Sequence, residues 1–89
     1  MSDAAGVIEG KVREIIQTHG HLTVDVSTLR PDADLYAAGM SSHASVSVML
    51  ALEDGFEVEF PDSMLKRSVF GSIASISQAL VALRATPVS

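Results

Sequence analysis

Hydrophobic residues recur every three or four positions along several segments of the chain, and this spacing predicts helices that each bury one face. The pattern places the first helix at about 3–19, with Ser2 to cap it and Gly20 to end it. It places the last helix at about 72–84. The apolar positions that mark these two helices are Ile8, Val12, Ile15, Ile16, Ile73, Ile76, Leu80 and Leu83.

Another helix is predicted at about 42–54, with Gly55 at its end. The positions assigned to its core face are Ser45, Val48, Met49, Leu52 and Phe56. The positions assigned to its outer face are His43, Val46, Ser47, Leu50 and Asp54. Two apolar residues on an outer face suggest a surface for a partner. A helix buried on both sides is the alternative reading of the same pattern.

The segment between the first two helices is predicted to be a long ordered loop. Leu22, Val24 and Val26 alternate with polar residues as in a strand, but no second alternating run exists to pair with it. We expect the loop to place in the core Leu22, Val26, Leu29 and Leu35. Pro61 precedes a short third helix at about 62–66. The fold class is therefore all-α, a small four-helix bundle in one domain of residues 1–89.

Composition narrows the partners and the chemistry. A net charge of −5 argues against nucleic acid and anionic membranes as partners. The chain has no cysteine, so any thiol that it uses comes from a cofactor. Seven acids and no base lie in residues 32–62, which suits a basic partner or serves only solubility. With no visible signal peptide or membrane-spanning run, we expect a cytoplasmic monomer.

No enzyme active site is predicted. The chain lacks the glycine- and lysine-containing loop that binds nucleotides and the paired-histidine motif of zinc enzymes. His19 and His21 flank a glycine, but a metal site needs a further ligand, and none converges there. His43 follows Ser42 directly, and neighbours on a helix point about 100° apart, so His43 is not placed to act as its base. We therefore expect a protein that is not an enzyme and holds no metal.

The two serines before the second helix carry the most information. Ser41 and Ser42 end a loop, and Met40 and Gly39 precede them. A serine at this place commonly caps the free N–H groups of a helix. It can instead carry a covalent phosphate, because a helix N-terminus favours an anion.

Several motifs together resemble the acyl carrier protein family: Asp34-Leu35, Gly39-Met40-Ser41-Ser42-His43, the apolar helix to Glu53-Asp54, and Phe56-Glu57-Val58-Glu59-Phe60-Pro61-Asp62. The resemblance extends from the first helix to the fourth. It implies a four-helix bundle with a long first loop. It also implies a serine at the start of helix two that carries 4′-phosphopantetheine, derived from coenzyme A. That serine matches Ser42, while Ser41 stands where the family usually has aspartate.

The run Gly-Met-Ser-Ser-His-Ala-Ser-Val more closely resembles stand-alone bacterial carriers that accept an activated amino acid. Such carriers imply three partners: a phosphopantetheinyl transferase, an amino acid:carrier protein ligase that looks like a seryl-tRNA synthetase core, and a downstream transferase. The residues expected to contact partners are Ser41, His43, Val46, Ser47, Leu50, Met64 and Leu65. A carrier of the fatty-acid or polyketide type is one alternative, and an unmodified acidic adaptor module is another.

Overall fold

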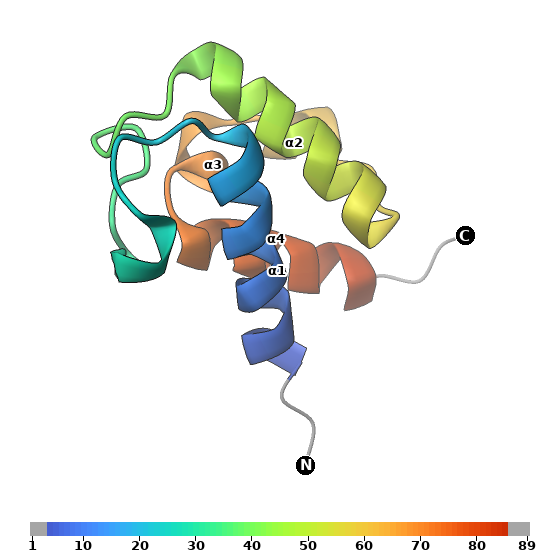
Figure 1. The fold of residues 1–89 in the computed structure, drawn as a ribbon. Coiled ribbons are helices and arrows are strands. Elements are labelled where there is room, and N and C mark those ends of the chain that lie inside the picture. Colours follow the sequence, from blue (N-terminus) through green and yellow to red (C-terminus); the bar gives the residue numbers. More distant parts are fainter. Residues whose placement is uncertain (1–3, 86–89) are drawn as a thin grey trace.

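The structure is a computed structural model in which residues 4–85 are described, and these residues form helices and loops without any strand. The helices, which Figure 1 shows, are α1 (Ala4–His19), the 3-10 turn η1 (Val26–Thr28), α2 (Ser42–Phe56), the 3-10 turn η2 (Asp62–Met64), α3 (Arg67–Phe70) and α4 (Ile73–Ala85). The predicted all-α bundle is thus confirmed. The predicted start of the first helix at residue 3, and its cap at Ser2, lie outside the described residues.

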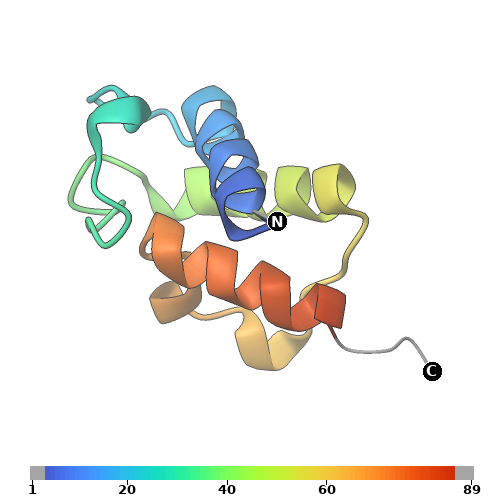
Figure 2. The same ribbon diagram turned by 90° about the horizontal axis from the view of Figure 1, so that it is seen from below.

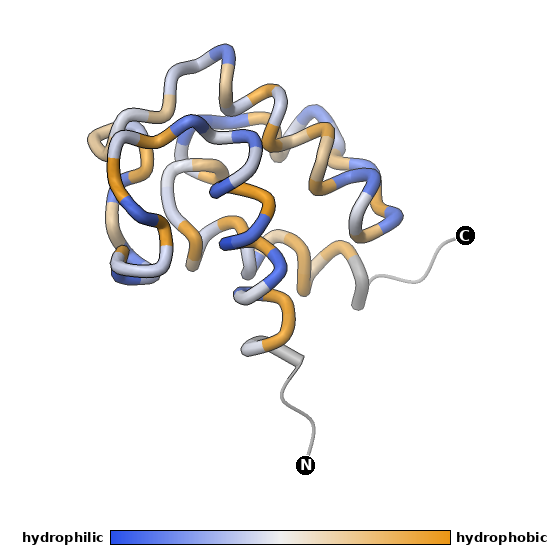
Figure 3. The backbone as a smooth tube through the Cα atoms, in the orientation of Figure 1, coloured by the Kyte–Doolittle hydropathy of each residue, from blue (hydrophilic) through white to orange (hydrophobic). Residues whose placement is uncertain are grey.

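Helix α1 is the element on which the others assemble. It packs against both α2 and α4, while α3 packs against α4 (Figures 1 and 2). Hydrophobic and hydrophilic positions alternate along these helices turn by turn, as Figure 3 shows. The single core that results contains three residues of the predicted core face of α2 and two apolar positions of α4, namely Val48, Leu52, Phe56, Ile76 and Leu80. It also contains residues that the periodicity did not assign to it, namely Met40, Ala44, Phe60, Phe70 and Ala79.

Helix α2 is longer than predicted at its C-terminal end. Gly55 does not stop the helix; the chain stays helical to Phe56, and Glu57 then turns left-handed at φ 54°. Position 55 faces α1, because a Cβ built on Gly55 would lie 3.4 Å from the Ile15 side chain, at ordinary van der Waals contact. Lys11 of α1 donates a 2.6 Å hydrogen bond to the Gly55 carbonyl and lies over the Phe56 ring. A cation at a helix C-terminus offsets the negative end of its dipole.

The long loop is ordered, as expected, and α1 holds its first half. Arg13 donates hydrogen bonds of 2.8 and 2.9 Å to the carbonyls of Val26 and Leu29. Val26 and Leu35 are fully buried, as predicted, whereas Leu22 and Leu29 are only partly buried against the core. The loop therefore forms one wall of the bundle.

The second half of the loop is fixed to the opposite end of the chain. The N–H of Leu35 donates to the carbonyl of Gly71 at 2.7 Å. The N–H of Ala74 donates to the carbonyl of Pro31 at 2.8 Å. The Asp34 carboxylate accepts the N–H of Tyr36 at 2.9 Å and so turns the chain there. These bonds place the Tyr36 turn next to the start of α4 and bring the loop to the start of α2.

The predicted third helix at 62–66 is wrong in its extent. Only Asp62–Met64 form a helical turn, and Lys66 is extended at φ −126° and ψ 148°. The α-helix of this region is α3 (Arg67–Phe70), which begins directly after the predicted range ends. Packing explains the shift: the Phe70 ring lies edge-on to the Phe60 ring, with centroids 5.2 Å apart. Both rings are buried, and α3 ends at Phe70 beside Phe60. Periodicity over so short a segment did not indicate this turn.

Candidate functional site

The two serines at the start of α2 have different roles. Ser41 is the N-cap, and its hydroxyl accepts the backbone N–H of Ala44 at 3.0 Å. Ser42 is the first helical residue and is exposed, and its hydroxyl forms no hydrogen bond within the described residues. Capping, the ordinary role of a serine here, is therefore performed by Ser41. The Ser42 hydroxyl is left free to react.

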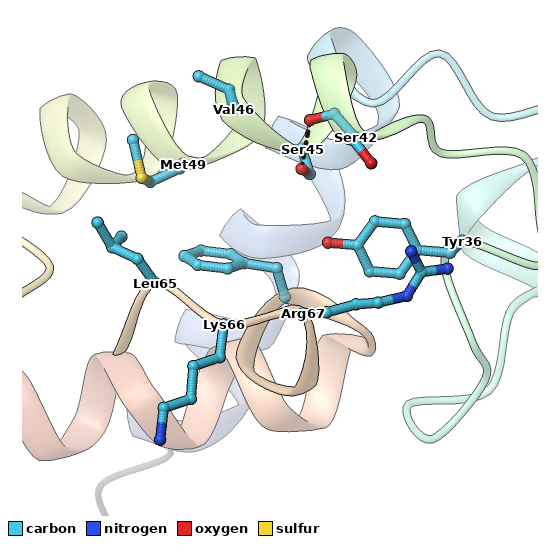
Figure 4. A pocket seen from close by; sticks show the side chains of 9 residues that line it. Tyr36, Ser42, Ser45, Val46, Met49, Leu65, Lys66 and Arg67 are labelled. Carbon is cyan, nitrogen blue, oxygen red and sulfur yellow. Dashed lines mark hydrogen bonds between the residues drawn. The ribbon is translucent and has the colours of Figure 1, made fainter. Parts of the chain in front are cut away.

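Ser42 opens onto a pocket of about 300 Å³ between α2 and the segment that leads into α3 (Figure 4). The pocket is lined by Tyr36, Ser42, Ser45, Val46, Met49, Leu65, Lys66, Arg67 and Phe70. Three chain segments thus contribute: the loop turn at Tyr36, the first two turns of α2, and residues 65–70. The wall beyond Ser42 is mainly apolar, since aliphatic and aromatic side chains form it.

Ser45 and Met49 are placed differently from the prediction, which assigned both to the core. Each is only partly buried and lines the pocket. The Ser45 hydroxyl donates a 2.6 Å hydrogen bond to the Ser42 carbonyl, shown dashed in Figure 4. That bond turns the Ser45 side chain back toward the helix start. Ala44, one position earlier, occupies the core place instead.

A stacked pair of residues forms the far side of the pocket from the apolar wall. The guanidinium of Arg67 lies 4.0 Å from the centroid of the Tyr36 ring. In Figure 4 the Arg67 side chain runs to the Tyr36 ring, while the Lys66 side chain runs the other way and its ammonium points away from Ser42. A guanidinium at this distance from an aromatic face gains a cation–π interaction.

The electrostatic environment of Ser42 favours an anion. The first turn of α2 contains no acidic residue, and its cap is a neutral serine. The positive end of the helix dipole is therefore not offset by a carboxylate. The nearest acid downstream on α2, Glu53, accepts the N–H of Phe60 at 2.8 Å and so anchors the following loop.

The residues predicted to contact partners do not all lie on one accessible surface. Val46, Leu50 and Leu65 are exposed by 51%, 55% and 46%, and Val46 and Leu65 line the same pocket as Ser42. His43 is exposed and Ser47 is partly buried. Met64 is partly buried and packs against the core, so Leu65 is the accessible one of that pair.

Sequence reasoning missed the aromatic and basic residues of the site. Tyr36 and Arg67 were assigned no role, although Tyr36 is the only tyrosine of the chain. The sequence did contain a signal for Tyr36. It directly follows Leu35, which was expected to place this part of the loop against the core. Arg67 was not considered because the third helix was predicted to end at residue 66, whereas Arg67 is the first residue of α3.

Two further expectations concern metal and membrane. Among residues 4–85, no group of three or more histidine, cysteine or acidic side chains is arranged to hold a metal ion. In the same part of the chain, none of the helices has both the length and the apolar character needed to cross a bilayer.

Comparison with known proteins yields one family. The family described as phosphopantetheine attachment site matches residues 11–80 of the chain. An aminoacyl carrier protein from Agrobacterium fabrum (strain C58) is 48% identical over 69 residues, which are 78% of this chain and 83% of that protein.

Solved structures show the same fold. One match is a chain of the crystal structure of an engineered Bradyrhizobium japonicum glycine:carrier protein ligase complexed with a carrier protein from Agrobacterium tumefaciens and ATP. It has a TM-score of 0.82 and 44% identity, and the match covers 84% of this chain and 97% of the other. A solution structure from Agrobacterium tumefaciens has a TM-score of 0.69 and 43% identity, with coverage of 85% and 92%.

Proposed function

The chain belongs to the phosphopantetheine attachment site family, and from this premise we propose that Ser42 carries the 4′-phosphopantetheine arm. One observation carries the assignment to this residue. The Ser42 hydroxyl is exposed and unbonded at the first position of α2, while its neighbour Ser41 caps the helix. A transferase can thus reach the Ser42 oxygen without breaking the cap of α2.

The residues around Ser42 fit such a group. The anionic phosphodiester would lie at the positive end of the α2 dipole, with no carboxylate in the first turn to repel it. In the attachment, the Ser42 oxygen bonds to the phosphorus that bears the pantetheine of coenzyme A, and the pyrophosphate P–O bond breaks. The serine proton passes to a base of the transferase, and adenosine 3′,5′-bisphosphate leaves.

The proposed function is that of a carrier for an activated amino acid or another acyl group. The arm supplies the thiol that this cysteine-free chain lacks, and a thioester on it stays activated for transfer. The chain itself supplies attachment and docking, and its partners supply the catalysis. The similarity to an aminoacyl carrier protein favours an amino acid over a fatty-acid or polyketide cargo.

We propose that the loading partner is an amino acid:carrier protein ligase. Support comes from the structural match to a complex of such a ligase with a carrier protein. The proposed contact surface consists of His43, Val46, Ser47 and Leu50 on the outside of α2, with Ser41 before it and Leu65 across the pocket. Met64 is the weakest member, because it packs against the core. A downstream transferase would meet the same surface, and a cytoplasmic monomer remains the prediction.

Intact mass spectrometry tests the attachment. The wild-type protein, incubated with a phosphopantetheinyl transferase and coenzyme A, should gain the mass of one arm. Ser42→Ala should stay unmodified and Ser41→Ala should still be labelled, because Ser41 caps the helix and Ser42 is the one of the two whose hydroxyl forms no hydrogen bond among the described residues. Labelling of Ser42→Ala to the wild-type extent would place the arm elsewhere, and a wild-type protein that is never labelled would favour the adaptor module.

The cargo is tested separately with the modified protein. Candidate amino acids, ATP and the ligase are added, and thioester formation is followed by a further mass increase that hydroxylamine removes. Loading with an amino acid supports the proposed class of carrier. Loading only by fatty-acid enzymes would assign the chain to the alternative carrier type.

A further inference from the structure

Arg67 forms no ion pair among the described residues, so its guanidinium is available to bind an anion. The central carbon of its guanidinium lies over the Tyr36 ring, 4.0 Å from the ring centroid, so the ring covers one side of the group. The N–H donors at its edge stay available for a second partner, and their planar fork matches phosphate oxygens. No carboxylate occupies them, since the ion pairs among the described residues join Arg13 to Glu9 and Arg30 to Asp32.

We propose that the stacked Arg67 binds the phosphodiester of the arm carried by Ser42 and thereby fixes the base of the arm in the pocket. The inference rests on the proposed attachment at Ser42. Arg67 and Ser42 line the same pocket of about 300 Å³, so a phosphate on the Ser42 oxygen would lie at the edge of the space that Arg67 borders. A hydrogen bond between two charged groups is about twice as strong as one between neutral groups.

Tyr36 is the platform that directs Arg67 toward this position. The Tyr36 turn is held by the Asp34 carboxylate at 2.9 Å and by the bond from Leu35 to Gly71 at 2.7 Å. These bonds hold the backbone of the turn, and the Tyr36 side chain is partly buried against the core. Contact with the ring therefore restricts the otherwise flexible Arg67 side chain. A guanidinium held in this way loses less conformational entropy when it binds phosphate than a free one.

The charges near Ser42 support the same assignment. The cap of α2 is neutral and the first helical turn has no acid, so nothing on α2 competes with the phosphate for Arg67. Arg67 and the positive end of α2 would both act on one anion. The base of the arm would then lie on the Tyr36 side of the pocket, which leaves the side formed by Val46 and Leu65 open to a partner protein.

Lys66 provides the matched control. It is the adjacent residue and carries the same charge, but its ammonium points away from Ser42 (Figure 4). Arg67→Gln and Lys66→Gln remove one positive charge each from neighbouring positions. An effect of overall charge would appear equally in both variants, whereas a contact with the phosphodiester would appear in Arg67→Gln alone.

The test is ³¹P NMR of the modified protein, which has a single phosphodiester. Spectra are recorded from about 0.01 M to about 1 M NaCl, a range over which the screening length falls from about 30 Å to about 3 Å. In the wild type and in Lys66→Gln, the resonance should move with salt as the contact with Arg67 is screened. In Arg67→Gln the movement should fall to about half or less.

Tyrosine fluorescence supplies a second readout that needs no partner enzyme. Tyr36 is the only tyrosine and the chain has no tryptophan, so the emission comes from the ring that Arg67 covers. Emission should differ between the unmodified and modified wild type, because the guanidinium gains a partner. The difference should persist in Lys66→Gln and vanish in Arg67→Gln. Circular dichroism checks that each variant is folded, and Arg67→Lys, which keeps the charge without the fork, should give intermediate results.

Three outcomes would overturn the inference. Equal salt-dependent movement in the wild type and Arg67→Gln would show that the phosphate does not meet Arg67. Equal losses in Arg67→Gln and Lys66→Gln would show an effect of net charge only. If intact mass shows that Ser42 takes no arm at all, the proposed function fails first and this inference fails with it. If both variants are labelled normally and either of the first two results is obtained, only the role of Arg67 is rejected.

Discussion

The hydroxyl of Ser41 accepts the backbone N–H of Ala44 at 3.0 Å, so the serine that caps α2 is not the serine proposed to carry the arm. This separation predicts different costs for two neighbouring substitutions. Ser41→Ala should lower the free energy of unfolding by about 0.5–2 kcal/mol, the range for loss of an N-cap. Ser42→Ala should change it by less than about 0.5 kcal/mol, as at other surface positions. Urea denaturation of the unmodified proteins measures both.

A conservative variant controls this first prediction. Ser41→Asp keeps a capping oxygen and adds a negative charge at the positive end of the helix, so it should retain the wild-type stability. If Ser42→Ala proves the more costly alanine substitution, the cap has been assigned to the wrong serine.

The bundle could be predicted because hydrophobic residues recur every three or four positions along its long helices. Ile16 and Ile76 lie on apolar faces that repeat over several turns, and both are fully buried. Helix ends and short elements follow other rules. Gly55 looked like a helix terminator, yet α2 continues through it to Phe56, and α3 ends at Phe70, whose ring packs edge-on against Phe60. Such contacts depend on tertiary packing, which no local pattern encodes.

For the candidate site, the sequence supplies the proposed attachment residue and the structure supplies its surroundings. Ser42 was proposed because motifs on both sides of it match the spacing of the family. Which of the two serines caps the helix could not be predicted, because the cap is assigned only once the first helical residue is known. Arg67 was missed because it meets Tyr36 only after the long loop has packed beside α3.

The core assignment of α2 yields a second prediction. Leu52 of α2 is fully buried in the core, so Leu52→Ala should reduce the free energy of unfolding by about 2–5 kcal/mol. Leu50, two positions earlier, is 55% exposed and provides the control. Leu50→Ala should cost no more than about 0.5 kcal/mol. Similar losses for the two leucines would mean that α2 is buried on both faces, which is the alternative left open by its sequence.

Two glycines should respond to alanine in opposite directions. Gly39 has φ of 116°, and a Cβ there would lie 3.2 Å from atoms of Thr23, so Gly39→Ala should destabilise by about 1–3 kcal/mol. Gly10 lies within α1 with nothing within 4 Å of an added Cβ. Gly10→Ala should stabilise by about 0.5–1 kcal/mol, because alanine loses less backbone entropy in a helix. Thermal and urea unfolding together check both signs.

The last prediction concerns docking of the loading ligase on the outside of α2. His43, Val46, Ser47 and Leu50 carry no acid, and Glu53 is occupied by the N–H of Phe60. The contact should therefore depend on apolar shape rather than on charge. Leu50→Ala should raise the KM of the ligase for the modified carrier by about 5–10-fold, which corresponds to about 1–1.4 kcal/mol. His43→Ala should act in the same direction, without loss of fold or of arm attachment.

Val7→Ala supplies the control for docking, since Val7 is 70% exposed on α1, a different helix from the proposed surface. It should load at the wild-type rate. Salt distinguishes the two kinds of interface, because contacts between exposed charges weaken steeply as salt screens them and apolar contacts do not. Loading should thus change little between about 0.05 M and about 0.5 M NaCl. If Leu50→Ala and His43→Ala load normally while added salt abolishes loading of the wild type, the ligase instead contacts the acidic segment between Asp54 and Asp62.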